Sequence, residues 1–92
     1  MTREEFEQLS AEEHEEYYKL YYSAYYLNRE GGHEEAAKLS RMQMDTVLIF
    51  GKVSPERQAV IEKQVEVRLN TIQAWLDEVW QPMYAEGRRP SA

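Results

Sequence analysis

The sequence predicts an all-α fold, a small bundle of three substantial helices preceded by a short N-terminal helix. Thr2 and Ser10 each stand three residues before a Glu, which is the capping-box pattern of a helix start. Glycines at 31, 32 and 51 interrupt the chain where a helix would end. Between these signals apolar side chains recur every three or four residues, the spacing of one helical face.

The first two helices follow from the two capping boxes. Thr2 with Glu5 predicts a short helix over residues 3–9, and Ser10 with Glu13 predicts a longer one over residues 11–29. The pair Gly31-Gly32 ends the second helix, because glycine readily adopts the left-handed conformation of a helix C-cap.

A third helix is expected over residues 33–50, ending at Gly51. Its last stretch, "TVLIF" at residues 46–50, is rich in β-branched and aromatic side chains and is also compatible with a strand. A single strand would have no strand to pair with in this chain, so helix is the preferred interpretation.

The fourth helix begins with Ser54 as N-cap and Pro55 at the first helical position. Its pattern extends over residues 55–80, and Pro82 should kink or stop it. We therefore expect one helical domain over residues 1–86 and a disordered tail over residues 87–92.

Composition limits the class of protein. A chain of 92 residues with 42% apolar and 30% charged side chains suits one domain with a modest core. It contains no cysteine, which excludes disulfides and thiolate metal sites and favours a reducing, cytoplasmic location. The longest unbroken aliphatic and aromatic run covers only residues 47–50, so no membrane-spanning segment is expected.

The negative charge is concentrated at one end. Residues 1–16 contain seven Glu and one Arg, giving -6, whereas the ten acidic and ten basic side chains of residues 17–92 balance. The net charge of -6 argues against direct nucleic-acid binding, because phosphate contacts require clusters of Lys and Arg.

Six of the seven tyrosines lie within "YYKLYYSAYY" at residues 17–26. Tyrosine combines a large rigid ring with a hydroxyl that tolerates water, and it is enriched at protein interfaces. We predict a partner-binding surface made of the following tyrosines with two glutamates at its rim: Tyr18, Tyr22, Tyr25, Tyr26, Glu12 and Glu16. The alternative is that the rings flank the core with their hydroxyls in solvent.

The fourth helix has two apolar stripes. One consists of residues at spacings of three, four and seven: Ile61, Val65, Ile72, Leu76, Val79 and Met83. The second repeats every seven residues and is joined by a tryptophan between the stripes: Val60, Val67, Ala74 and Trp75. Because one small core needs only one stripe, we expect the second to contact either a second protomer, as a homodimer, or a different protein.

No pattern of catalysis or metal binding is present. The only Glu-x-x-His spacing, Glu30 to His33, is interrupted by two glycines, and His14 lies within "EEHEE", a pattern typical of a solvated first turn. No carboxylate is accompanied by a nucleophile or an oxyanion donor. We therefore expect no enzymatic activity, no metal and no cofactor.

Three functions remain compatible with the sequence. The first is a small acidic interaction module, a regulator, an assembly adaptor or an inhibitor such as those phages direct against host systems, that occludes or bridges another protein. The second is an acidic nucleic-acid mimic that blocks a nucleic-acid-binding protein. The third is a structural homo-oligomer or scaffold part.

Overall fold

The computed structural model describes residues 1–80, and side chains are described as far as residue 78. It contains α1 (Arg3–Glu7), α2 (Ala11–Glu30), α3 (Glu34–Phe50) and α4 (Pro55–Trp75), which continues as a π-helical segment, η1 (Leu76–Trp80). The predicted all-α fold is confirmed, and no strand occurs among residues 1–80. The predictions made for Pro82 and for the tail over residues 87–92 lie outside the described residues.

The helices begin where the capping signals predict. The Thr2 hydroxyl accepts a hydrogen bond from the Glu5 amide at 3.1 Å. Ser10 and Glu13 form the reciprocal bonds of a capping box. Ser54 accepts from the Arg57 amide at 3.2 Å, with Pro at the start of α4. The segment over residues 46–50 is helical, so the strand alternative is not adopted.

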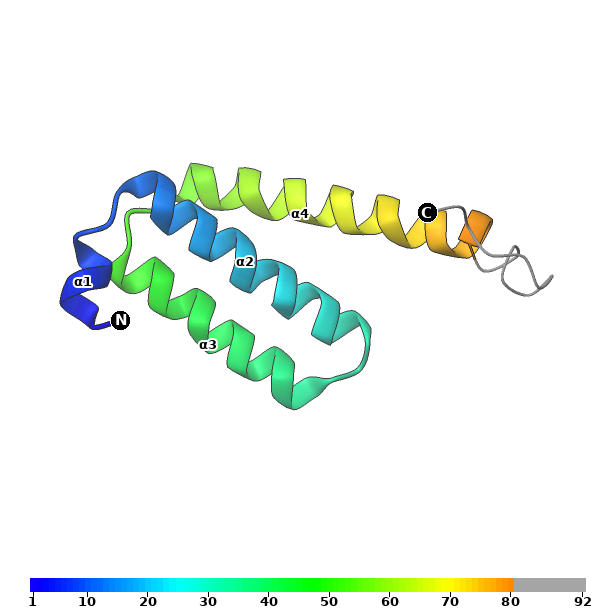
Figure 1. Cartoon of the computed structure of the whole chain (residues 1–92), viewed down its shortest axis with the longest axis horizontal. Coiled ribbons are helices and arrows are strands. Elements are labelled where there is room, and N and C mark those ends of the chain that lie inside the picture. The colour runs from blue at the N-terminus through cyan, green and yellow to red at the C-terminus, as the bar shows by residue number, and fades with distance from the viewer. Residues whose placement is uncertain (81–92) are drawn as a thin grey trace.

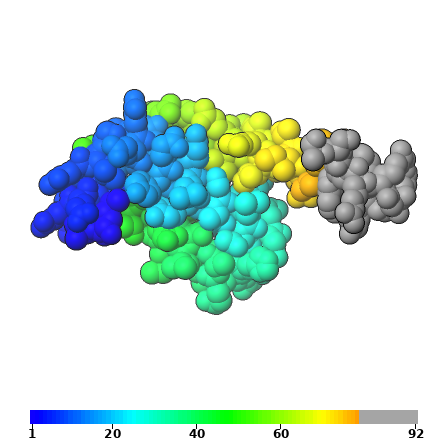
Figure 2. Space-filling view, in the orientation of Figure 1, coloured from blue at the N-terminus to red at the C-terminus, as the bar shows by residue number. Residues whose placement is uncertain are grey.

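The three long helices are arranged around α2 (Figure 1). Helices α2 and α3 form an antiparallel hairpin, and α4 packs on another side of α2. The backbones of α3 and α4 do not approach each other, so α2 is the central element. Helix α4 lies close to α2 near its own start, diverges from it and extends past the tip of the hairpin (Figures 1 and 2).

A compact apolar core lies where the three helices face one another. It consists of two side chains from each long helix: Tyr18, Tyr22, Met44, Val47, Ile61 and Val65. Two polar side chains, His14 and Ser40, are buried beside it. Among residues 1–80, no helix has the length and apolar character needed to cross a membrane.

Candidate interaction surfaces

Two of the tyrosines predicted to bind a partner are core residues. Tyr18 is 0% exposed and Tyr22 is 8% exposed, so a partner has no access to either ring in the folded chain. This corrects the sequence-based expectation. The physical reason is that both rings lie on the side of α2 that faces α3 and α4 together, where the packing neighbours are Met44, Val47, Ile61 and Val65.

The hydroxyls of these two phenols differ in their surroundings. The Tyr22 hydroxyl donates a hydrogen bond of 2.7 Å to a Glu66 carboxylate oxygen of α4. The Tyr18 hydroxyl is buried and has no hydrogen-bond partner within the part of the chain described. Burial, assisted by the negative charge of Glu62, raises the pKa of Tyr18 to about 12. Burial and the bond to Glu66 also raise the pKa of Tyr22. Both phenols therefore stay protonated at neutral pH and well into the alkaline range.

Tyr25 and Tyr26 remain partly accessible. The Tyr26 hydroxyl donates to the Asn70 side-chain oxygen at 2.9 Å and so ties α2 to α4. The ring of Tyr25 lies under the Arg41 guanidinium of α3, 5.8 Å from its centroid. Of the four predicted partner-binding tyrosines, Tyr25 and Tyr26 are the two that a partner can touch.

His14 is fully buried, contrary to the expectation of a solvated face. Its Nδ1 accepts a hydrogen bond from the Lys52 amide at 2.8 Å, so its Nε2 carries the proton and donates to the Phe6 carbonyl at 2.6 Å. Its ring lies 4.4 Å from the Phe6 ring. His14 thus joins α1, α2 and the turn between α3 and α4, which gives it a structural role.

Gly51 makes this junction possible. A Cβ atom at this position would lie 2.5 Å from the Val47 carbonyl oxygen and 3.3 Å from His14 Cγ. The absence of a side chain lets the turn pass directly over the imidazole. The Lys52 side chain then reaches back to donate to the Leu9 carbonyl at 2.9 Å.

The acidic end of the chain is partly neutralised. Glu12 and Glu16, the two glutamates predicted to contact a partner, are exposed on α2. Lys19 lies 3.9 Å from Glu16, and the neighbouring Glu15 forms an ion pair of 2.8 Å with Arg57 of α4. Imitation of a phosphate backbone requires a run of carboxylates without neighbouring positive charges. These two ion pairs compensate part of that negative charge.

An exposed apolar stripe follows the outer side of α3. This stripe was not predicted from the sequence. It consists of Leu39, Met42 and Ile49, which are 59%, 65% and 71% exposed. Their spacing of three and seven residues places them on one helical face, away from the buried Met44 and Val47. The spacing of these three residues is visible in the sequence and could have indicated an apolar side of α3. The sequence does not show, however, which of the two sides of α3 packs inward.

A shallow hollow of about 440 Å³ adjoins this stripe. It is formed between α2 and α3 by the following side chains: Tyr25, Ala37, Lys38, Arg41 and Met42. We call the stripe and the hollow together the α3 surface. It combines a tyrosine, an arginine and flexible apolar side chains, the residue types that dominate binding energy at protein interfaces.

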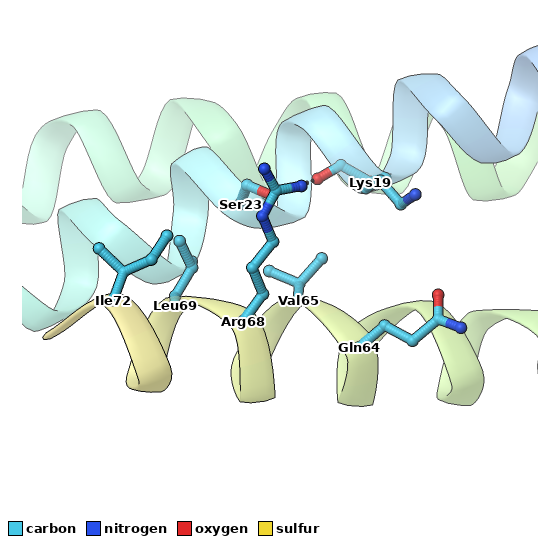
Figure 3. Close-up of a pocket in the computed structure, with 7 residues that line it drawn as sticks. All are labelled: Lys19, Ser23, Gln64, Val65, Arg68, Leu69 and Ile72. Carbon is cyan, nitrogen blue, oxygen red and sulfur yellow. Dashed lines mark hydrogen bonds between the residues drawn. The ribbon is translucent and has the colours of Figure 1, made fainter. Parts of the chain in front are cut away.

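A groove separates α2 and α4 (Figure 3). It has a volume of about 250 Å³, and Val65, Leu69 and Ile72 of α4 point across it toward α2. Lys19 of α2 and Arg68 of α4 stand at its mouth. Within the described residues no carboxylate pairs with Arg68. The groove is therefore apolar in its floor and basic at its edge.

The residues predicted for a dimer interface are all exposed on α4: Val60, Val67, Ala74 and Trp75. Helix α4 packs against α2 through Ile61 and Val65. Both residues belong to the first of the two apolar stripes predicted for this helix. Trp75 lies on the same side of α4 as Arg68, which stands seven residues earlier. Whether these side chains meet a second copy stays a prediction.

Metal binding has no support within residues 1–80, where no group of three or more His, Asp or Glu side chains is placed to hold an ion. Comparisons with protein-family models, with curated proteins and with solved structures found no match. The functional argument therefore depends on the surfaces described above.

Proposed function

We propose that this protein is a small helical interaction module that regulates, inhibits or assembles a partner protein by covering an apolar surface of that partner with its α3 surface. The observation that carries the proposal is the alignment of Leu39, Met42 and Ile49, three large apolar side chains that are more than half exposed on one face. Scattered exposed apolar residues are ordinary, whereas an aligned set is typical of binding sites.

The surroundings of the stripe support a reversible contact. Two exposed ion pairs flank it, Lys38 with Glu35 at 3.7 Å and Arg41 with Asp45 at 3.5 Å. Both signs of charge are therefore present around an apolar centre, the arrangement of a protein interface with a polar rim. The chemistry that fits best is an amphipathic helix or an apolar groove of the partner.

Occlusion or bridging would be the mechanism, since the α3 surface carries no nucleophile or paired acid and base. Arg41 lies over Tyr25 and holds the ring at the edge of the hollow. A partner side chain inserted between Tyr25 and Met42 would contact the rigid tyrosine ring on one side and the flexible methionine side chain on the other. Such anchoring contacts account for most of the affinity in interfaces of this kind.

The test is a single charge introduced into the stripe. Partners are first captured from native extract by cross-linking to the wild-type chain, and the affinity of the purified partner is then measured by calorimetry. Met42→Glu should weaken binding by at least about tenfold, because a carboxylate would be desolvated in the contact. The melting temperature should stay unchanged, since Met42 is 65% exposed.

The matched control is Ala36→Glu, which adds the same charge at an exposed position of α3 outside the stripe. It should bind as the wild type does. Equal affinities for the wild type and both variants would show that the partner is bound elsewhere, and the proposal for the α3 surface would have to be abandoned.

A further inference from the structure

We propose that the groove between α2 and α4 binds a small amphiphilic carboxylate, a molecule with a hydrocarbon chain and one acidic head group. Three features of the groove carry this inference: an apolar floor, positive charge toward one of its ends and a size that suits a short chain. The groove shares no lining residue with the α3 surface, so the inference does not depend on the proposed function.

The groove is apolar at one end and polar at the other (Figure 3). Leu69 and Ile72 of α4 line the apolar end, and the buried Val65 lies between the two ends. Lys19 of α2 and Gln64 of α4 line the polar end. A ligand that contacts both ends therefore needs an apolar body and a polar head group.

The cations of the groove favour an acidic head group. The Arg68 side chain extends from α4 toward α2, and none of the carboxylates described as far as residue 78 forms an ion pair with it. Lys19 has an exposed partner at a long distance, Glu16 at 3.9 Å. A guanidinium binds a carboxylate through two parallel hydrogen bonds. A ligand carboxylate between Arg68 and Lys19 would therefore pair with positive charge that the chain leaves largely uncompensated.

The size of the groove indicates a small ligand. Its volume of about 250 Å³ lies just below the ~300–1,000 Å³ of sites for drug-sized molecules. Its α4 side extends from Gln64 to Ile72, about 12 Å at the helical rise per residue. This length suits the extended chain of a medium-chain fatty acid. A partner helix, about 10–12 Å across with its side chains, is too bulky to enter a hollow of this volume.

The net charge of the chain opposes the binding of an anion. At -6 the protein repels negative ligands at a distance, but salt confines this repulsion to a Debye length of about 8 Å under physiological conditions. The affinity must therefore come from contacts within the groove, from burial of the hydrocarbon chain and from the pair with Arg68.

The probe is octanoate, and octylammonium and 1-octanol have the same chain length with a different head-group charge. Calorimetric titration of the full chain, below the concentrations at which these compounds form micelles, should show octanoate binding at least about tenfold more tightly than octylammonium. Methyl chemical shifts locate the ligand. Octanoate should shift the signals of Leu69 and Ile72 and leave those of Leu39 and Ile49, on the α3 surface, unchanged.

Substitutions separate the head-group contact from the apolar contact. Arg68→Gln removes the cation and should weaken octanoate binding by about tenfold without changing the affinity for 1-octanol. The matched control Lys63→Gln removes one positive charge from another side of α4 and should change neither affinity. Ile72→Ala shortens the apolar wall and should weaken octanoate and 1-octanol alike, by about threefold. Ile72 is 46% exposed, so circular dichroism should show an intact fold.

Two outcomes would overturn the inference. The first is a wild-type chain that does not bind octanoate at up to about 10 mM. The second is octanoate binding that Arg68→Gln does not weaken, or that shifts Leu39 and Ile49 in place of Leu69 and Ile72. Either result of the second kind would show apolar adsorption without recognition of the carboxylate by this groove.

Discussion

The two sides of α2 are the reverse of what their residue types suggest. On one side the phenols Tyr18 and Tyr22 are buried in the core, while on the other the aliphatic Leu20 and Leu27 are 61% and 56% exposed. A tyrosine carries a hydroxyl that burial desolvates, and a leucine carries none. The difference shows that burial along this helix depends on where α3 and α4 stand and not on the hydrophobicity of each side chain.

The buried side shows how the fold accommodates phenols. Tyr22 reaches a carboxylate of α4, and Tyr26 reaches an amide of the same helix, so two hydroxyls act as cross-links between α2 and α4. Leucines in these positions would fill space without fixing the position of α4 along α2. Among the long helices, only the backbone of α2 approaches that of α4, so these bonds contribute to the register of α4 along α2.

The largest expected effect is the loss of stability on truncating a buried residue of α2. An exposed residue on the opposite side of the same helix gives the comparison. Tyr18→Ala should lower the free energy of unfolding by about 3–5 kcal/mol, because it opens a cavity among the helices. Leu20→Ala, two residues away, should change it by less than about 0.5 kcal/mol. Urea denaturation followed by circular dichroism measures both. Similar losses for the two variants would refute the orientation of α2.

Alkaline pH should test the burial of Tyr18 and Tyr22 without any mutation. The pKa of Tyr18 is raised from 10.0 to about 12, so the folded chain resists losing a proton that the unfolded chain releases. The associated stability is complete below pH 10 and is lost as the pH rises toward 12. Tyr18 alone should account for about 1 kcal/mol by pH 11, and Tyr22 adds to this loss.

Unfolding at pH 7 to 11, combined with absorbance of the phenolate, measures this loss. The Tyr18→Phe/Tyr22→Phe variant is the control, because it removes both raised groups and should flatten the alkaline decline. A decline of equal size in the variant would assign the alkaline sensitivity to other groups.

The smallest expected effect distinguishes the two buried hydroxyls. Tyr22→Phe removes the 2.7 Å bond to Glu66 and should cost about 1 kcal/mol. Tyr18→Phe removes a buried hydroxyl that has no partner within residues 1–80 and should be neutral or slightly stabilising. Thermal melts of the two single variants suffice. If Tyr18→Phe were the more harmful change, its hydroxyl would have to be hydrogen-bonded in solution, with Gln58 or Glu62 as the nearest candidates.

The helix boundaries could be read from the sequence because their causes are local. Thr2, Ser10 and Ser54 bond to amides three residues away, and Gly31, Gly32 and Gly51 stand at the helix ends. Interactions over three or four residues operate before any tertiary contact forms. The all-α class was predicted for the same reason.

The candidate surfaces were predicted less well. Tyr18 and Tyr22 were assigned to a partner surface and are core residues, while Leu39, Met42 and Ile49 were missed. In both helices the periodicity shows two apolar sides but not which side meets a neighbour. Which side of a helix is buried depends on contacts with helices that are distant in the sequence. The residue pattern of one helix therefore cannot predict it.

The sequence by itself determined the helices, their ends and the concentration of charge in residues 1–16, because each follows from neighbouring residues. Only the tertiary structure decided that the phenols face inward, that the leucines of α2 face solvent and that His14 is buried. The bond between Tyr22 and Glu66 spans 44 positions and that between Lys52 and His14 spans 38. Such contacts form only when packing brings distant helices together, and they fix which side of each helix remains available to a partner.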